Sequence, residues 1–199
     1  EKMISNDMFV ANDVYLDMLT DSGTNAMSDN QLSAMMRADD AYAGSQSFER
    51  LVKGIEDVLG KRYFLPVHQG RAAENIIART FVKPGQCVLT NYHFTTTLEH
   101  VNEVGGKIIE LLKDEALILK SDNPFKGNID IDKLVEAIET EGAENVAFIR
   151  MEASTNLIGG QPFSIRNMMD VRQVADKYGI ILVLDASLLG ENAYLVKQR

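Results

Sequence analysis

Apolar residues follow two alternating patterns along most of the chain, short continuous runs and runs at helical spacing. The continuous runs predict strands at 63–67, 87–92, 107–112, 145–151 and 180–184. The helical spacing predicts helices at 47–59, 72–81, 95–104, from 132, at 164–178 and from 191. Asp132 and Ser164 are predicted to cap two of these helices, and Gly60 to end the first. Strands that alternate with amphipathic helices predict a mostly parallel sheet with helices on both faces, an α/β fold.

The first 47 residues differ from the rest because they contain little periodic apolar pattern. They are rich in Asp, Asn, Ser, Thr and Gly, which favour turns and side-chain hydrogen bonds to the backbone. One short helix is predicted over 28–37, begun by Ser28 or Asp29. Such a segment suits an arm that packs on a neighbouring subunit. We therefore divide the chain into this arm, 1–47, and the N-terminal part of a larger domain, 48–199.

The composition is ordinary for a globular protein, with 45% hydrophobic and 25% charged residues. The net charge of −9 argues against a surface for nucleic acid or for an anionic membrane. No apolar run approaches the length of a membrane span. The single cysteine, Cys87, lies in an apolar run, which predicts a core residue. One cysteine also suits a reducing compartment, so we expect a cytoplasmic protein.

Both ends of the chain predict that it is part of a longer protein. It begins at Glu1 without a methionine, and it stops at Arg199 within a predicted helix. Cleavage by a trypsin-like protease and an arbitrary end point explain the terminal arginine equally well.

Polar residues stand where the predicted strands end. In a parallel sheet covered on both faces, ligands bind beyond the carboxyl ends of the strands. The residues predicted at these ends are His68–Gly70, Tyr92–Phe94, Glu152–Asn156 and Asp185. The topology alone therefore places a candidate site among these four segments.

Three of these segments are consistent with one specific ligand. A strand that passes through Gln69, Gly70 and Arg71 into a helix suits a phosphate, although an ordinary connection with a surface arginine explains it too. Asp185 ends the most apolar run, where a carboxylate needs a cationic partner or serves as a structural hydrogen-bond acceptor. A protonated pyridine nitrogen is one such cation, which points to pyridoxal phosphate (PLP). Phe94 could stack on its ring or lie in the core.

The chain resembles the tyrosine phenol-lyase and tryptophanase family, PLP-dependent β-eliminating lyases with the aspartate-aminotransferase fold (fold type I). The resemblance runs in order over nearly all 199 residues, and details at 25–28 and 94–97 favour the tyrosine phenol-lyase branch. The segments that carry it are Thr20-Asp-Ser-Gly-Thr-Asn-Ala-Met-Ser28, Asp40-Ala-Tyr-Ala-Gly-Ser45, His68-Gln-Gly-Arg-Ala-Ala-Glu-Asn75, Phe94-Thr-Thr-Thr97, Asn156-Leu-Ile-Gly-Gly-Gln-Pro162, Asp185-Ala186 and Glu191-Asn-Ala-Tyr194.

The resemblance implies a role for each matching residue. Those that bind the cofactor are Gln69, Gly70 and Arg71 at the phosphate, Phe94 on the ring, Asn156 at the phenolic oxygen and Asp185 at the ring nitrogen. Thr20, Ser22 and Asn156 match residues at the substrate carboxylate, and Tyr42 matches a general acid for the leaving group. Gly23 and Asp40 match part of a K⁺ site. The arm 1–47 is then a small-domain and active-site segment, and 48–199 is the N-terminal part of the PLP-binding large domain.

The chain departs from the family pattern at several positions. Leu188 stands where the family has an arginine three residues after the aspartate, and Asp40 stands in place of a glutamate. Asp7 aligns with a phenylalanine of the phenol-lyase pocket. No lysine of this chain matches the one that binds the cofactor covalently, which the family places some tens of residues after the aspartate.

The function implied by the resemblance is cleavage of an aromatic L-amino acid into phenol or indole, pyruvate and ammonia. We assign this activity to the full-length protein, which we expect to be a homo-oligomer, and expect the 199 residues alone to be inactive. The departures leave open a PLP-dependent β-lyase of another amino acid, or a non-catalytic remnant of the fold. A nicotinamide-binding protein is disfavoured, because no Gly-x-Gly-x-x-Gly follows a strand.

Overall fold

The computed structural model describes residues 27–39 and 41–199. The chain divides into two compact units, Glu1–Leu65 and Pro66–Arg199, which we describe separately. The predicted functional boundary between 47 and 48 is a different division and stays a prediction. Five residues singled out from the sequence lie outside the described residues, namely Asp7, Thr20, Ser22, Gly23 and Asp40.

The described part of the first unit consists of two helices, α1 (Asp29–Met36) and α2 (Gln46–Leu59). The Ser28 hydroxyl accepts from the Gln31 N–H, and the Gln31 side chain accepts from the Ser28 N–H, a reciprocal cap that begins α1. The helix α2 ends at Gly60, which has a φ of 63°. Both helices and the Gly60 end confirm the sequence-based predictions.

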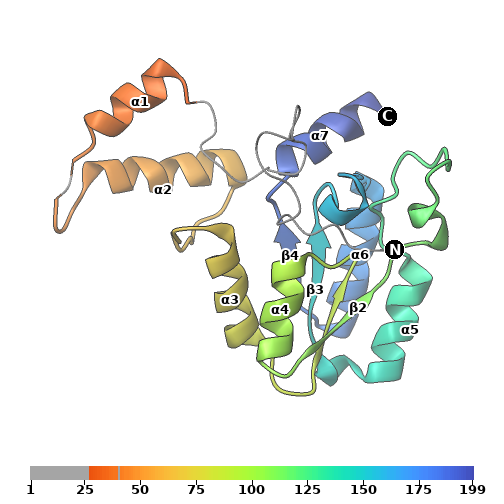
Figure 1. Ribbon diagram of the computed structural model, residues 1–199. Helices are drawn as coiled ribbons and strands as arrows, with labels where there is room; N and C mark the ends of the chain where they lie inside the picture. The colour runs from red at the N-terminus through yellow and green to blue at the C-terminus, as the bar shows by residue number, and fades with distance from the viewer. Residues whose placement is uncertain (1–26, 40) are drawn as a thin grey trace, which may run out of the picture. The chain divides into compact units, whose positions relative to one another are not determined.

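Four parallel strands form the sheet of the second unit (Figure 1), and their order is β2-β1-β3-β4. They are β1 (Cys87–Thr90), β2 (Lys107–Glu110), β3 (Val146–Glu152) and β4 (Leu182–Asp185). The helices of this unit are α3 (Gly70–Phe81), α4 (Thr95–Glu103), α5 (Ile131–Glu141), α6 (Ile165–Tyr178) and α7 (Leu189–Gln198). Short 3-10 turns lie at Asp114–Leu117, Ala143–Asn145 and Asn156–Ile158. The predicted α/β fold is confirmed.

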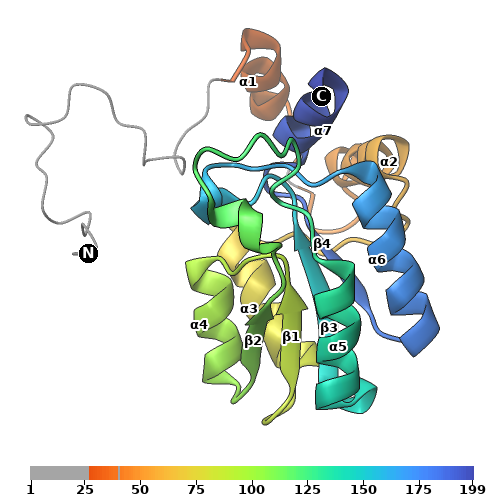
Figure 2. The ribbon, with the colours of Figure 1, turned by 90° about the vertical axis from the view of Figure 1, so that its right-hand side faces the viewer.

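Helices cover both faces of this sheet, with α3 and α4 on one face and α5 and α6 on the other (Figure 2). Because side chains alternate along a strand, Leu89 and Ile149 face α5 and α6, while Val88 and Phe148 face α3 and α4. Cys87 is fully buried in the larger of the two cores, as predicted, and burial raises the pKa of its thiol. No helix in the described part of the chain is both long and apolar enough to cross a membrane.

The strand predicted at 63–67 is wrong. These residues form no strand, and Tyr63 and Leu65 are 83% and 69% exposed. Pro66 interrupts the run and has no N–H to donate to a neighbouring strand. The Phe64 ring instead stacks on Phe48 of α2, with 5.6 Å between the ring centroids.

Two further predictions need correction. The run at 180–184 forms a strand at 182–185, but this strand lies at the edge of the described sheet and none of its residues is fully buried. The cap of α5 is Asp130 instead of Asp132, because the Asp130 carboxylate accepts from the N–H groups of Asp132 and Lys133. Ser164 caps α6 as predicted, since its hydroxyl accepts from the Asn167 N–H.

Candidate functional site

A row of polar side chains crosses the carboxyl end of the sheet on the face covered by α3 and α4. Strand register places Thr90 of β1 beside Arg150 of β3, and Glu152 of β3 beside Asp185 of β4. Arg150 and Glu152 follow Phe148 at intervals of two residues, so all three point to the same face. The sheet therefore brings one cation and two carboxylates together.

Arg150 is the centre of this cluster, and the whole residue is only 3% exposed. Its Nη2 donates to Asp185 Oδ2 at 2.7 Å, and its Nη1 donates to Glu152 Oε2 at 3.2 Å. Nη1 also lies 3.2 Å from the main-chain oxygen of Tyr92 and 3.4 Å from Thr90 Oγ1. These contacts fix the guanidinium between the ends of β1, β3 and β4.

The two carboxylates of the cluster differ in electrostatics. Burial raises the pKa of Asp185, but the Arg150 charge and the hydrogen bonds from Ser187 outweigh it, so the pKa lies below its ordinary value. Ser187 donates to Asp185 Oδ1 from its hydroxyl at 2.7 Å and from its N–H at 3.1 Å. For Glu152, burial outweighs the Arg150 charge, and the nearby Asp185 charge adds to it, so the pKa is raised.

The loop after β3 is fixed by buried amides. The Asn91 side chain donates to the main-chain oxygen of Glu152 and to Thr155 Oγ1, both at 3.0 Å, and accepts from the Glu152 N–H at 3.1 Å. The Asn156 N–H donates to Glu152 Oε1 at 3.0 Å. Ser154 is buried with a φ of 51°, and its hydroxyl has no partner among the described residues. Such backbone strain and an unpaired buried hydroxyl concentrate at functional sites.

The N-terminal ends of α3 and α4 lie beside this face and are joined by one side chain. Glu74 of α3 accepts from the hydroxyls of Thr96 and Thr97 of α4, each at 2.5 Å. Gln69 makes no side-chain cap at the start of α3, so the first N–H groups of this helix are not capped by it. A Cβ built at Gly70 would meet no atom within 4 Å, which leaves room for a ligand next to the backbone.

The residues predicted to bind the cofactor occupy three places in the second unit. Asp185 and Asn156 belong to the Arg150 cluster, and Phe94 is the half-buried residue that begins α4, directly after β1 and its loop. Gln69, Gly70 and Arg71 begin α3, but no strand precedes them, which corrects the predicted strand–turn–helix. Tyr42 belongs to the first unit and is fully exposed.

Arg150 was missed by the sequence reasoning, and Glu152 was predicted only as the start of a strand-end segment, without a role, although a signal for both was present. The apolar run 145–151 contains Arg150, and Glu152 follows two positions later. Charges spaced by two residues in a buried strand point to the same face, where they need partners. Asp185 was expected to need a cation, and among the described residues Arg150 is that cation.

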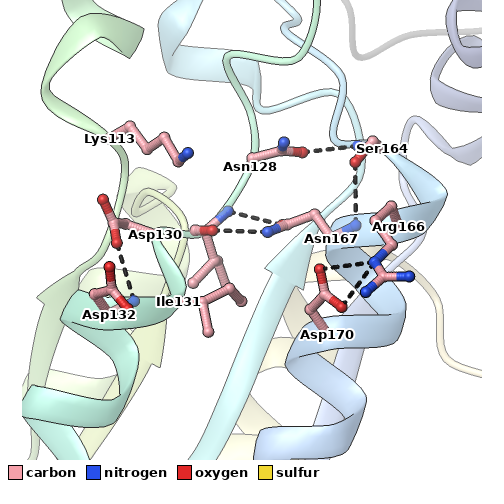
Figure 3. Close-up of a pocket in the computed structure, with 10 residues that line it drawn as sticks. Lys113, Asn128, Asp130, Ile131, Asp132, Ser164, Arg166, Asn167 and Asp170 are labelled. Carbon is pink, nitrogen blue, oxygen red and sulfur yellow. Dashed lines mark hydrogen bonds and ion pairs between the residues drawn. The ribbon is translucent and has the colours of Figure 1, made fainter.

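A cavity of about 260 Å³ lies on the opposite face of the sheet, between the beginnings of α5 and α6 (Figure 3). Several of its polar groups serve the fold. Asp130 and Ser164 cap the two helices, and the Asn167 amide bonds both the N–H and the oxygen of Ile129. Because these groups already have hydrogen-bond partners, they do not form a cluster of buried charges like the one around Arg150.

Comparisons with known proteins show the family of this chain. The family "Beta-eliminating lyase" matches residues 17–199. Tyrosine phenol-lyase of Clostridium tetani is 48% identical over 187 residues, which are 94% of this chain but 41% of that enzyme. The chain thus spans about two fifths of the length of the curated relatives it matches.

Solved structures show the same fold. The Pyrococcus horikoshii kynurenine aminotransferase, in complex with PMP, has a TM-score of 0.56 at 17% identity over 76% of this chain and 38% of that one. NtdA of Bacillus subtilis, with bound cofactor PMP, has a TM-score of 0.51 at 26% identity over 72% of this chain and 29% of that one. The solved structures show the aminotransferase-like fold. The family match over residues 17–199, most of this chain, establishes that the chain belongs to the β-eliminating lyase family.

Proposed function

We propose that the full-length protein is a PLP-dependent lyase that cleaves an aromatic L-amino acid, tyrosine or tryptophan. The products are phenol or indole, pyruvate and ammonia. One observation carries the proposal, namely the ionised, partly buried Asp185 at the carboxyl end of the sheet in a chain 48% identical to a tyrosine phenol-lyase. The activity belongs to the full-length protein, of whose relatives this chain spans about two fifths.

The donor set of the second unit fits PLP. An anionic carboxylate at the end of β4 suits a protonated ring nitrogen. The start of α3, where Gln69 provides no side-chain cap and space is open at Gly70, suits a phosphate, and Arg71 adds a cation there. PLP, when bound, supplies a ring that accepts the electrons released from the substrate.

The proposed roles of the chain's own residues are those that the family resemblance implies. Asp185 holds the proton on the ring nitrogen, Phe94 stacks on the ring, and Gln69, Gly70 and Arg71 bind the phosphate. Asn156, whose N–H is fixed by Glu152, orients the phenolic oxygen and the substrate carboxylate. Thr20 and Ser22 bind the same carboxylate, and Tyr42 donates a proton to the leaving ring carbon.

A different amino-acid substrate is a second candidate, favoured by Leu188. This residue precedes α7, three positions after Asp185, and offers an apolar side chain where an arginine would offer five N–H donors. A lyase of another amino acid would retain Asp185 and the phosphate site, and would differ in the products that it releases.

Three further properties remain part of the proposal. Gly23 and Asp40 provide oxygen ligands for K⁺, the full-length protein is a homo-oligomer, and it is cytoplasmic. A homo-oligomer is supported by α2, which carries an apolar stripe that the described part of its own unit does not bury.

The test uses the full-length protein with added PLP. We expect a cofactor absorbance band that survives gel filtration, and we expect pyruvate release from L-tyrosine or L-tryptophan in equal amount to phenol or indole. Pyruvate release from only a non-aromatic amino acid would favour the second candidate. Binding of PLP without turnover of any amino acid would favour the non-catalytic remnant.

A further inference from the structure

The charges at the carboxyl end of the sheet are unbalanced. Arg150 is the cation of the cluster, whereas Glu152 and Asp185 supply two negative charges when both are ionised. The side chains of Arg150 and Glu152 are only 4% and 6% exposed, and that of Asp185 is 18% exposed. Because unpaired charge is costly in such a place, the cluster favours the arrival of one further cation.

Hydrogen bonds and exposure together indicate which carboxylate this cation would meet. Each oxygen of Glu152 has a buried protein partner, Arg150 at Oε2 and the Asn156 N–H at Oε1. In Asp185, two donors of Ser187 contact Oδ1, and Arg150 contacts Oδ2. A carboxylate oxygen can accept two hydrogen bonds, so both carboxylates retain acceptor capacity. The Asp185 side chain is 18% exposed and that of Glu152 only 6%, so Asp185 Oδ2 is the oxygen that a further donor can reach.

The pKa shifts of the two carboxylates also favour Asp185 as the partner of the further cation. Burial raises the pKa of Glu152, Arg150 opposes this effect, and the Asp185 charge adds to it. The pKa of Asp185 is lowered, because Arg150 and Ser187 outweigh its burial. Asp185 is therefore ionised readily, while the excess negative charge makes ionisation of Glu152 harder.

Three other residues with titratable side chains near the cluster have contacts of their own. His93, which follows β1, pairs with Glu110 of β2. Glu74 of α3 accepts from Thr96 and Thr97 of α4. Tyr92 contributes its main-chain oxygen to Arg150, and its ring stacks on His93.

We propose that Glu152 is a positioning residue whose negative charge balances Arg150 and so leaves the charge of Asp185 to a protonated pyridine nitrogen. This inference rests on the proposed function. With the cofactor bound, two cations and two carboxylates form a neutral cluster. Without the Glu152 charge, Asp185 alone would face both Arg150 and the ring cation, and the ring nitrogen would lose its proton more easily.

The test follows the ring nitrogen directly, by NMR of the full-length protein loaded with PLP that carries ¹⁵N in its ring. The pH at which the nitrogen loses its proton is compared between variants. We expect Glu152→Gln to lower this pH by about one unit or more, a tenfold change in proton affinity. We expect Arg150→Gln to raise it, because only the cation is removed. Glu110→Gln, which removes a carboxylate at the same end of the sheet, should leave it unchanged.

The midpoint is the pH at which half of the ring nitrogen has lost its proton. A combined Arg150→Gln and Glu152→Gln variant should return this midpoint toward that of the parent, which a merely structural role for Glu152 would not do. An unchanged or raised midpoint in Glu152→Gln overturns the inference. If that variant does not fold, an unchanged or lowered midpoint in Arg150→Gln overturns it. A full-length protein that binds no PLP overturns the proposed function itself, and the inference with it.

Discussion

Asp185 is the residue on which both the sequence and the structure converge. The sequence predicted that a carboxylate after an apolar run needs a cationic partner, and the structure provides Arg150 at 2.7 Å. This contact keeps Asp185 ionised, because the Arg150 charge and the Ser187 hydrogen bonds outweigh the effect of burial on its pKa. The contact does not exhaust the acceptor capacity of the carboxylate, so it is compatible with the proposed partner on the cofactor.

Replacement of Asp185 by asparagine tests that role. Asp185→Asn in the full-length protein keeps the shape and removes the charge that holds the ring proton. We expect PLP to bind more weakly and exchange of the substrate α-proton to slow about 100-fold or more, about 2.7 kcal/mol in activation free energy. The measurement is α-deuterium exchange at saturating PLP. Near-equal exchange rates would mean that Asp185 has only a structural role.

Ser154 offers a second test at this scale. Its φ of 51° is a conformation that only glycine adopts without strain, and its buried hydroxyl has no partner among the described residues. We expect Ser154→Gly to be more stable to urea than Ser154→Ala by about 1 kcal/mol, since both lack the hydroxyl and only alanine keeps the strain. Equal stabilities would argue against a positive φ in solution.

At the scale of elements, the site depends on how α3 and α4 meet. The sequence predicted both helices, but their N-terminal ends are joined by Glu74, which no local pattern indicated. This carboxylate links the start of α3, with Gln69, Gly70 and Arg71, to the first turn of α4, directly after Phe94. The proposed phosphate and ring contacts therefore share one positioning side chain.

Removal of this side chain should affect stability and cofactor binding together. We expect Glu74→Ala to destabilise the full-length protein by about 2 kcal/mol, because two hydrogen bonds to a charged group are lost. PLP affinity should fall about tenfold as α3 and α4 lose their link, equal to about 1.4 kcal/mol. Urea unfolding and fluorescence titration with PLP measure the two effects. Glu99→Ala, at an exposed position of α4, is the matched control and should change neither.

At the scale of the whole molecule, the chain's helix α2 has an apolar stripe without a buried residue, and Val58 on it is 80% exposed. An uncovered stripe of this kind is typical of a surface that packs on another part of an assembly. The chain also spans only about two fifths of the curated relatives it matches. Both observations favour an active unit larger than this chain.

We expect light scattering of the full-length protein to show a homo-oligomer. Val58→Glu should shift the mass toward that of the monomer, because a charge would then be buried in the contact. Lys53→Glu, on the same helix and also exposed, introduces the same residue outside the apolar stripe and should leave the mass unchanged. A fully active monomer would contradict the expected assembly.

The sequence alone determined the elements that local physics governs. Continuous apolar runs and helical periodicity predicted the parallel sheet with its helices, and residues such as Ser28, Gly60 and Ser164 marked helix ends through hydrogen bonds and backbone preferences. Apolar content wrongly predicted a strand at 63–67, where Pro66 has no N–H to donate to a sheet. It also wrongly predicted full burial at 180–184, because burial of a strand depends on its place in the strand order.

Only the tertiary structure decided which charges meet. Arg150 and Asp185 are 35 residues apart in sequence and become neighbours because β3 and β4 pair in one register. Glu74 reaches Thr96 and Thr97 only because α3 and α4 pack on the same face of the sheet. The sequence could therefore name Asp185 as a charge in need of a partner. The identity of that partner depended on strand order and register, which are set by packing between elements distant in the chain.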